Sequence, residues 1–206
     1  MKTTLRMAAL LLCTVGLQTG FAAGRRVDNV QPKVTLIGSP EIMAQIRGGS
    51  PKKARIPGPG EPAPVWLEFE SDFDSADEFP ELVFKYGILL KTAQGLKLLQ
   101  GEVTHVDVAR GKDRHSVVYI GPKALNRLSD GKPFAMANVM AQMVTVSAQG
   151  EPIVVQFKSS HGITYEQFAK EEDKLEKVTD VFLNKGQTPF APLFWDYYEA
   201  VKPSSR

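Results

Sequence analysis

The stretch VWLEFESD, residues 65–72, indicates the fold class of this 206-residue chain. Val65, Leu67 and Phe69 occupy alternate positions, and bulky or acidic side chains stand between them. Successive side chains of a β-strand point to opposite faces, so a period of two is typical of a strand with one face in a core. Residues 65–72 are therefore predicted to form a half-buried strand.

Similar runs continue on the C-terminal side. We predict strands over residues 82–91, 98–108, 114–120, 140–148, 153–157, 175–183 and 188–201, with a hairpin turn at Gln149-Gly150. Two half-apolar sheets must bury their faces against each other. The sequence therefore predicts a mainly β fold, an immunoglobulin-like β-sandwich of about seven to eight antiparallel strands.

Short helices are predicted at three places. Pro122 is a favourable first residue for a helix that closes near Gly131. Thr164 and Gln167 match a capping box ahead of a charged helix. Ser39-Pro40 could start another short helix.

Residues 1–22 are predicted to be a secretory signal peptide, with Lys2 and Arg6 before an apolar run over residues 7–17. Cys13 follows a leucine where a lipoprotein signal needs a small residue, so we expect cleavage without lipidation. The exported chain would then hold no cysteine, no disulfide and no membrane span, and its stability would come from its core. We expect it in the periplasm, on the outer surface or secreted.

The mature chain divides into two predicted parts: an N-terminal arm and linker over residues 23–63, and the sandwich domain over residues 64–203. Nine of the 17 residues over 48–64 are Gly or Pro, which is typical of a linker. Residues 34–37 are a short strand-forming run. We expect this run to serve assembly by pairing with a sheet edge of another chain, or else to be the first strand of its own sandwich.

Charge is unevenly distributed although the mature chain is neutral. Without Lys2 and Arg6, 23 basic residues balance 23 acidic residues, which argues against a nucleic-acid partner. Residues 25–56 carry a net charge of +5, and residues 57–84 carry −8. The simplest interpretation is two solvated surfaces; the alternative is that charge steers the arm toward a sheet edge.

No familiar catalytic or nucleotide-binding motif is present, so we expect no enzyme activity, no cofactor and no metal. One group of residues could form a metal site and argues against this expectation. If Arg110-Gly111-Lys112 were a hairpin loop, His105, Asp107 and His115 would share one face and could bind a divalent metal. We interpret them instead as a surface Asp–His pair, for which each histidine contributes less than about 1 kcal/mol.

Two other groups have a structural and a functional interpretation. Asp72, Asp74, Asp77 and Glu78 resemble a loose calcium loop but lack its regular spacing, so a solvated acidic turn is favoured. The C-terminal run FAPLFWDYY, residues 190–198, should place one set of aromatic side chains in the core. The residues that could contact a partner or a glycan are Val34, Leu36, Trp66, Trp195 and Tyr197.

Two stretches, TPFAPLFWDYYEAVKP (188–203) and LLQGEVTHVDVARGKDRHSVVYIGPKALNRL (98–128), resemble small secreted immunoglobulin-like proteins of verrucomicrobial type IV pilus-like gene clusters, as does KVTLIGSPE (33–41). The resemblance implies a role in a cell-surface or periplasmic assembly, and it supplies no catalytic residues. Unlike an ordinary type IV pilin, the chain has small and basic residues after the cleavage site and no long apolar helix.

Three functions are therefore carried forward. The first is an exported, non-enzymatic module that acts by protein–protein contact in a surface or pilus-like assembly, self-association included. The second is a carbohydrate-binding module that uses Trp66, Trp195 or Tyr197. The third is a metal-dependent hydrolase at His105, Asp107 and His115.

The signal peptide can be tested directly. We expect the exported protein to begin near Ala23, because the only long apolar run of the chain lies before that residue. Mass spectrometry of the native N-terminus measures this. An N-terminus at an acylated Cys13 would contradict it.

Overall fold

The structure is a computed structural model that describes residues 26–40, 43–44, 52–53, 64–194 and 196–203. The predicted signal peptide, most of the predicted linker and Trp195 lie outside the described residues. Among the described residues, no helix is both long enough and apolar enough to cross a membrane.

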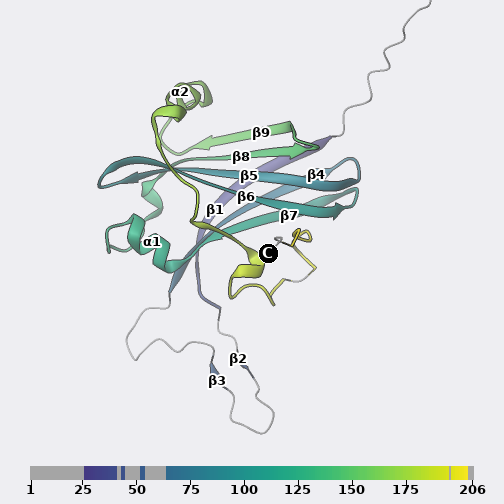
Figure 1. Ribbon diagram of the computed structural model, residues 1–206, viewed down its shortest axis with the longest axis horizontal. Coiled ribbons are helices and arrows are strands. Elements are labelled where there is room, and N and C mark those ends of the chain that lie inside the picture. Colours follow the sequence, from purple (N-terminus) through teal and green to yellow (C-terminus); the bar gives the residue numbers. More distant parts are fainter. Residues whose placement is uncertain (1–25, 41–42, 45–51, 54–63, 195, 204–206) are drawn as a thin grey trace, which may run out of the picture.

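Two sheets pack face to face, as Figure 1 shows. The four-stranded sheet has the order β1 (Val27–Gly38), β4 (Val65–Ser75), β7 (Gly111–Ile120) and β11 (Phe182–Asn184). The five-stranded sheet has the order β10 (Glu176–Val178), β6 (Gly95–Val108), β5 (Phe79–Thr92), β8 (Val139–Ala148) and β9 (Glu151–Ser159). All pairs are antiparallel except β10 with β6. The predicted mainly β sandwich is confirmed, with nine strands in these two sheets.

The core lies between the sheets and follows the alternation of residues 65–72. Leu67 and Phe69 on β4 are buried and belong to the same apolar cluster as Phe84 and Ile88 on β5. Val65, at the end of the strand, departs from the predicted pattern and is exposed, whereas Trp66 and Glu70 on the outer face are buried. Truncating such an inward aromatic side chain to alanine typically costs about 3–5 kcal/mol.

The predicted N-terminal arm belongs in part to the sandwich. β1 pairs antiparallel with β4, with Val34 opposite Phe69 and Leu36 opposite Leu67. Val27 and Val30 are buried in the main core. The domain boundary predicted at residue 64 is therefore wrong, and residues 34–37 are part of the first strand of their own sheet.

The intervening segment returns the chain to the neighbouring strand. The Ser39 amide donates a hydrogen bond to the Pro64 carbonyl over 2.8 Å. This bond brings together the two ends of the long connection between β1 and β4. The entropy of closing a loop rises only slowly with its length, so this connection is tolerable. Most of the helix predicted after Ser39 lies outside the described residues, and two described residues within it form a strand instead: β2 (Met43–Ala44) pairs with β3 (Lys52–Lys53).

The hairpin predicted around residues 110–112 is also wrong. β6 pairs with β5 and β10, whereas β7 pairs with β4 and β11. The chain crosses between the two sheets at this point, after Asp107 adopts the left-handed region with φ 53°. A turn signal shows where a strand ends, but it does not show which sheet the next strand joins.

Two short helices pack against the sandwich. α1 (Pro122–Leu128) follows the predicted bounds and buries Leu125 and Leu128. α2 (Tyr165–Glu171) has the predicted capping box at Thr164. Its Phe168 packs on Leu89 and Leu98, on the outer face of the five-stranded sheet. In Figure 1 both helices are on the left of the view, α2 at the top and α1 lower down.

The C-terminal run is not the predicted strand. The 3-10 turn Lys185–Gln187 leads into a series of turns, and of the described residues after it Val201 alone forms a bridge, with His105 on β6. Pro189 and Pro192 have no amide hydrogen to donate to a ladder, which accounts for the irregular path. Phe190 is buried against Trp66 and Tyr119, so the segment covers the outer face of the four-stranded sheet.

The position of β1 gives a stability prediction. A chain that lacks residues 1–38 should lose cooperative thermal unfolding, because it exposes the β4 edge and removes Val27 and Val30 from the core. A chain that begins at Ala23 is the control and should unfold cooperatively. If the shorter chain melts within a few degrees of the control, β1 is a separable arm after all.

Candidate functional site

The outer face of the four-stranded sheet carries the candidate site. On β4 the side chains of Glu68, Glu70, Asp72 and Asp74 occupy alternate positions, opposite in direction to Phe69 and the core. The C-terminal segment, which we define as the described residues of the range 188–199, lies over this acidic row. Between them is a cavity of about 590 Å³. It is lined by Ile37, Gly38, Glu68, Glu70, Phe190, Leu193, Phe194, Tyr197 and Tyr198.

Aromatic packing holds one side of this cavity. Phe190 stacks on Tyr119 with ring centroids 4.8 Å apart and meets Trp66 edge to face at 5.6 Å. The Tyr119 hydroxyl hydrogen bonds with Glu68. Burial is the main cause that raises the pKa of the Glu68 carboxyl, and the bond from Tyr119 opposes this shift. The lining is thus apolar and aromatic, with carboxylates placed at its base.

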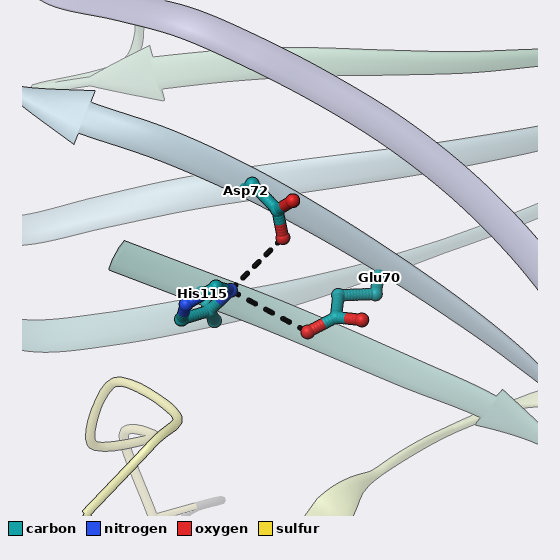
Figure 2. Close-up of side chains that lie close together, drawn as sticks. All are labelled: Glu70, Asp72 and His115. Carbon is teal, nitrogen blue, oxygen red and sulfur yellow. Dashed lines mark hydrogen bonds and ion pairs between the residues drawn. The ribbon is translucent and has the colours of Figure 1, made fainter. Parts of the chain in front are cut away.

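His115 lies beside the acidic row, as Figure 2 shows. Its Nδ1 is 2.9 Å from Asp72 Oδ1 and 3.4 Å from Glu70 Oε1. The β4–β7 register places Asp72 directly opposite His115, and Glu70 is two residues further along the same face. The Tyr197 ring stacks on the imidazole with centroids 3.8 Å apart and an interplanar angle of 15°.

The charges of this cluster act on one another. Burial raises the pKa of the Glu70 carboxyl most, and the neighbouring Asp72 and Glu68 raise it further, while His115 and the Tyr197 hydroxyl lower it. Burial and the two nearby carboxylates raise the pKa of Tyr197 to about 12. The arrangement concentrates negative charge in a half-enclosed space and can accept a cation.

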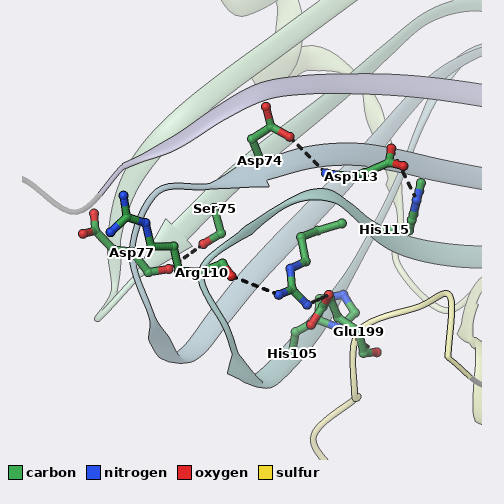
Figure 3. Close-up of polar contacts among 9 residues, drawn as sticks. Asp74, Ser75, Asp77, His105, Arg110, Asp113, His115 and Glu199 are labelled. Carbon is green, nitrogen blue, oxygen red and sulfur yellow. Dashed lines mark hydrogen bonds and ion pairs between the residues drawn. The ribbon is translucent and has the colours of Figure 1, made fainter.

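His105 has a different role, inside the sandwich. Its Nε2 is 2.6 Å from Ser116 Oγ, which also accepts a 2.7 Å bond from the Tyr86 hydroxyl. Its Nδ1 is 3.2 Å from the Glu199 carbonyl oxygen, and Figure 3 shows His105 beside Glu199. A carbonyl only accepts, so Nδ1 carries the proton and Nε2 accepts from Ser116. Burial lowers the pKa of His105 to about 4.

The structure does not bring the predicted trio His105, Asp107 and His115 together. His105 is buried between the sheets, Asp107 is exposed, and His115 is on the other sheet. The surface interpretation of the two histidines is therefore wrong as well, because both are buried. The error follows from the assumed hairpin.

The acidic residues that resemble a loose calcium loop do not converge on one point. Asp74 accepts bonds from the Asn29 amide and the Asp113 backbone, the second of which is drawn in Figure 3. Asp77 accepts from the Arg26 backbone amide. These carboxylates join neighbouring loops, and Asp72 turns instead toward His115.

The predicted contact residues differ in their burial and in the groups that they contact. Trp66 is only 8% exposed and donates from Nε1 to Ser39 Oγ over 2.8 Å, so it cannot offer a stacking platform. Val34 and Leu36 pack on the core of their own domain. Tyr197 is 46% exposed, next to the cavity. Trp195 lies outside the described residues.

Sequence reasoning missed Glu68, Glu70, Tyr119, Phe194 and Tyr198 as site residues. The signal for the carboxylates was present in the alternation of residues 65–72, which placed them on one face. The simplest interpretation of this acidic stretch, a solvated surface, left no reason to expect that the C-terminal run lies over it. The aromatic lining had no comparable signal, because it depends on where the irregular segment lies.

Comparison with known proteins gives a family and a fold. A protein-family model matches residues 21–205, which is nearly the whole chain. The chain belongs to that family. No curated protein matches it significantly. A crystal structure of a protein from Akkermansia muciniphila is similar, with a TM-score of 0.59 and 21% identity, and the match covers 85% of this chain and 96% of that chain. This structural similarity shows the sandwich fold. The organism of the similar protein is a verrucomicrobium, the same bacterial group as the proteins that the sequence resembles.

The buried His105 predicts a pH dependence. Its pKa falls from 6.5 to about 4 on folding, so the unfolded chain binds the extra proton between these values. Stability is therefore complete above about pH 6.5 and falls as the pH drops toward 4, by up to about 3 kcal/mol from this group. Urea unfolding of the wild type and of His105→Gln between pH 4.5 and 7 measures it.

The variant should be less stable at pH 7 by about 1–3 kcal/mol, because its buried partners lose bonds. It should also show a flatter pH dependence than the wild type. His161→Gln removes an exposed histidine and serves as the control. Equal slopes for the wild type and His105→Gln would contradict a buried, neutral His105.

Proposed function

We propose that the chain is an exported, non-enzymatic module that acts by protein–protein contact in a cell-surface or pilus-like assembly. The contact site is the cavity beneath Phe194, and it receives a basic side chain of the partner protein. The family and the fold are consistent with this role without specifying it.

The observation that carries the proposal is the state of Phe194. This residue adopts the left-handed region with φ 54° and is 62% exposed. This conformation costs a bulky L-residue about 1–2 kcal/mol, and the exposed ring buries little apolar surface to offset that cost. Strained, exposed aromatic side chains of this kind occur at binding sites, where an interaction outside the free chain offsets the strain.

The cavity chemistry favours a cation. Glu68 and Glu70 lie at its base, and the rings of Phe194, Tyr197 and Tyr198 stand around it. Carboxylates and ring faces together suit the charged head and apolar stem of lysine or arginine. Lys185, whose Nζ lies 5.5 Å from the Tyr198 ring centroid, shows the same type of contact within the chain.

The chain itself contains segments of the complementary charge. Arg47, Lys52, Lys53 and Arg55 belong to the stretch with net charge +5, and the acidic row belongs to the stretch with −8. A second copy is therefore one source of the basic ligand, and a different surface protein is another. Opposite charges of this size speed association and make it sensitive to salt.

The carbohydrate-binding alternative loses one of its three platforms. Trp66 is buried under Phe190, so within the described part of the chain sugar stacking would depend on Phe194 and Tyr197. Two carboxylates at the cavity base suit a cation better than a neutral sugar. Glycan binding is retained as an outcome of the experiment.

The test uses the exported chain and a labelled peptide of residues 46–56. Phe194→Gly should raise the free energy of unfolding by up to about 1 kcal/mol, because glycine accepts a positive φ without strain. The same variant should weaken peptide binding by about tenfold or more, as loss of a contact aromatic does. Fluorescence anisotropy and urea unfolding measure the two effects.

Glu68→Gln should also weaken binding and reduce its salt dependence. Val155→Ala, on the exposed face of β9, removes an exposed apolar side chain elsewhere and should change neither quantity. The proposal is wrong if basic peptides bind equally to the wild type and Phe194→Gly. Binding of neutral glycans that Phe194→Gly abolishes would favour the carbohydrate module instead.

A further inference from the structure

Three possible metal ligands converge beside the cavity, to which Glu70 also belongs. The Nδ1 of His115, Oδ1 of Asp72 and Oε1 of Glu70 form a group whose donor atoms all lie within 4.8 Å of one another. Around a tetrahedral ion with bonds near 2.0 Å, neighbouring donors are about 3.3 Å apart. The distances from Nδ1, 2.9 Å and 3.4 Å, are close to that spacing.

The backbone presets this arrangement. Asp72 and His115 are direct partners in the β4–β7 ladder, and Glu70 lies two residues along β4 on the same face. Side chains on two hydrogen-bonded strands are held at a spacing that thermal motion changes little. In Figure 2 both carboxylates point toward the same edge of the imidazole.

Glu70 supplies an independent observation. The residue is 8% exposed, and its Oε1 has no hydrogen-bond partner among the described residues. One proton on Nδ1 can be donated well to only one acceptor, and Asp72 is the closer at 2.9 Å. A buried carboxylate oxygen without a hydrogen-bond donor is unfavourable, and a cation bound at this place would satisfy it.

The surroundings hold the ligands in position. The Tyr197 ring stacks on His115, and the Tyr197 hydroxyl hydrogen bonds to the Glu70 carboxylate. Such contacts orient metal ligands and are part of a metal site. The Asp72 side chain is 46% exposed, which leaves a path from solvent.

We propose that Glu70, Asp72 and His115 bind one divalent transition-metal ion, zinc before manganese. An imidazole with two carboxylates suits these ions, whereas calcium prefers oxygen ligands alone. Three protein ligands leave a position for water or for a side chain of a partner. The ion would satisfy Glu70 and hold the imidazole on which Tyr197 packs, so it would brace the C-terminal segment.

The experiment uses the untagged, metal-stripped chain, titrated calorimetrically with zinc chloride, manganese chloride and calcium chloride. Zinc should bind with 1:1 stoichiometry. His115→Asn and Glu70→Gln should each weaken zinc binding by more than about 100-fold, because each removes or weakens a direct ligand. X-ray absorption at the zinc edge should show one nitrogen and two oxygen ligands from the protein.

Two control variants test whether the binding is specific. Asp74→Asn removes a carboxylate two residues along the same face, and His161→Asn removes an exposed histidine; both should leave zinc affinity within about threefold, as non-ligands do. Circular dichroism checks that each variant is folded. If His115→Asn does not fold, Glu70→Gln still tests the site.

Saturable calcium binding without zinc binding would overturn the assignment, as would zinc binding that neither ligand variant weakens. Absence of saturable zinc binding below about 1 mM would also overturn it, since a preformed three-ligand site binds more tightly than that. Phe194→Gly should keep its zinc affinity, so failure of the metal site and failure of the proposed partner contact are separable.

Discussion

A directional chain of hydrogen bonds inside the sandwich is the interaction on which the rest of the structure depends. Tyr86 on β5 donates to Ser116 on β7, Ser116 donates to His105 on β6, and His105 donates to the Glu199 carbonyl. The chain links both sheets and attaches the C-terminal segment to them. Buried polar groups destabilise the fold when they are unpaired, and this arrangement of the sheets and the C-terminal segment pairs the polar groups of all four residues.

The attachment at Glu199 places the C-terminal segment over the outer face of the four-stranded sheet and so forms the candidate site. The Glu199 amide donates to the His115 carbonyl, and Arg114 pairs with the Glu199 carboxylate over 2.9 Å. With its end held at this corner, the C-terminal segment lies across β4 and β7 and encloses the acidic row. Burial of the carboxylates is the main cause that raises the pKa of Glu68 and Glu70, and it outweighs the opposing effects of Lys33 on Glu68 and of His115 on Glu70.

The two proposals draw on this same physical state in different ways. An organic cation would enter from the side of Phe194, where the lining is aromatic. A metal ion would lie against His115, where the donors are a nitrogen and two oxygens. Both would offset negative charge concentrated by the fold, and the strained φ of Phe194 and the unpartnered Oε1 of Glu70 are separate observations in their support.

The sequence by itself determined the features that depend on local geometry. The period of two over residues 65–72 correctly separated Leu67 and Phe69 from the acidic row, and Thr164 and Pro122 marked the starts of both helices. Only the tertiary structure decided which sheet each strand joins, that β1 belongs to the domain, and that residues 188–199 cover β4. His115 therefore meets Asp72 and Glu70, not His105 and Asp107. The physical reason is that alternation fixes the face of a side chain within its own strand, whereas its neighbours across strands follow from long-range pairing and burial, which no local pattern encodes.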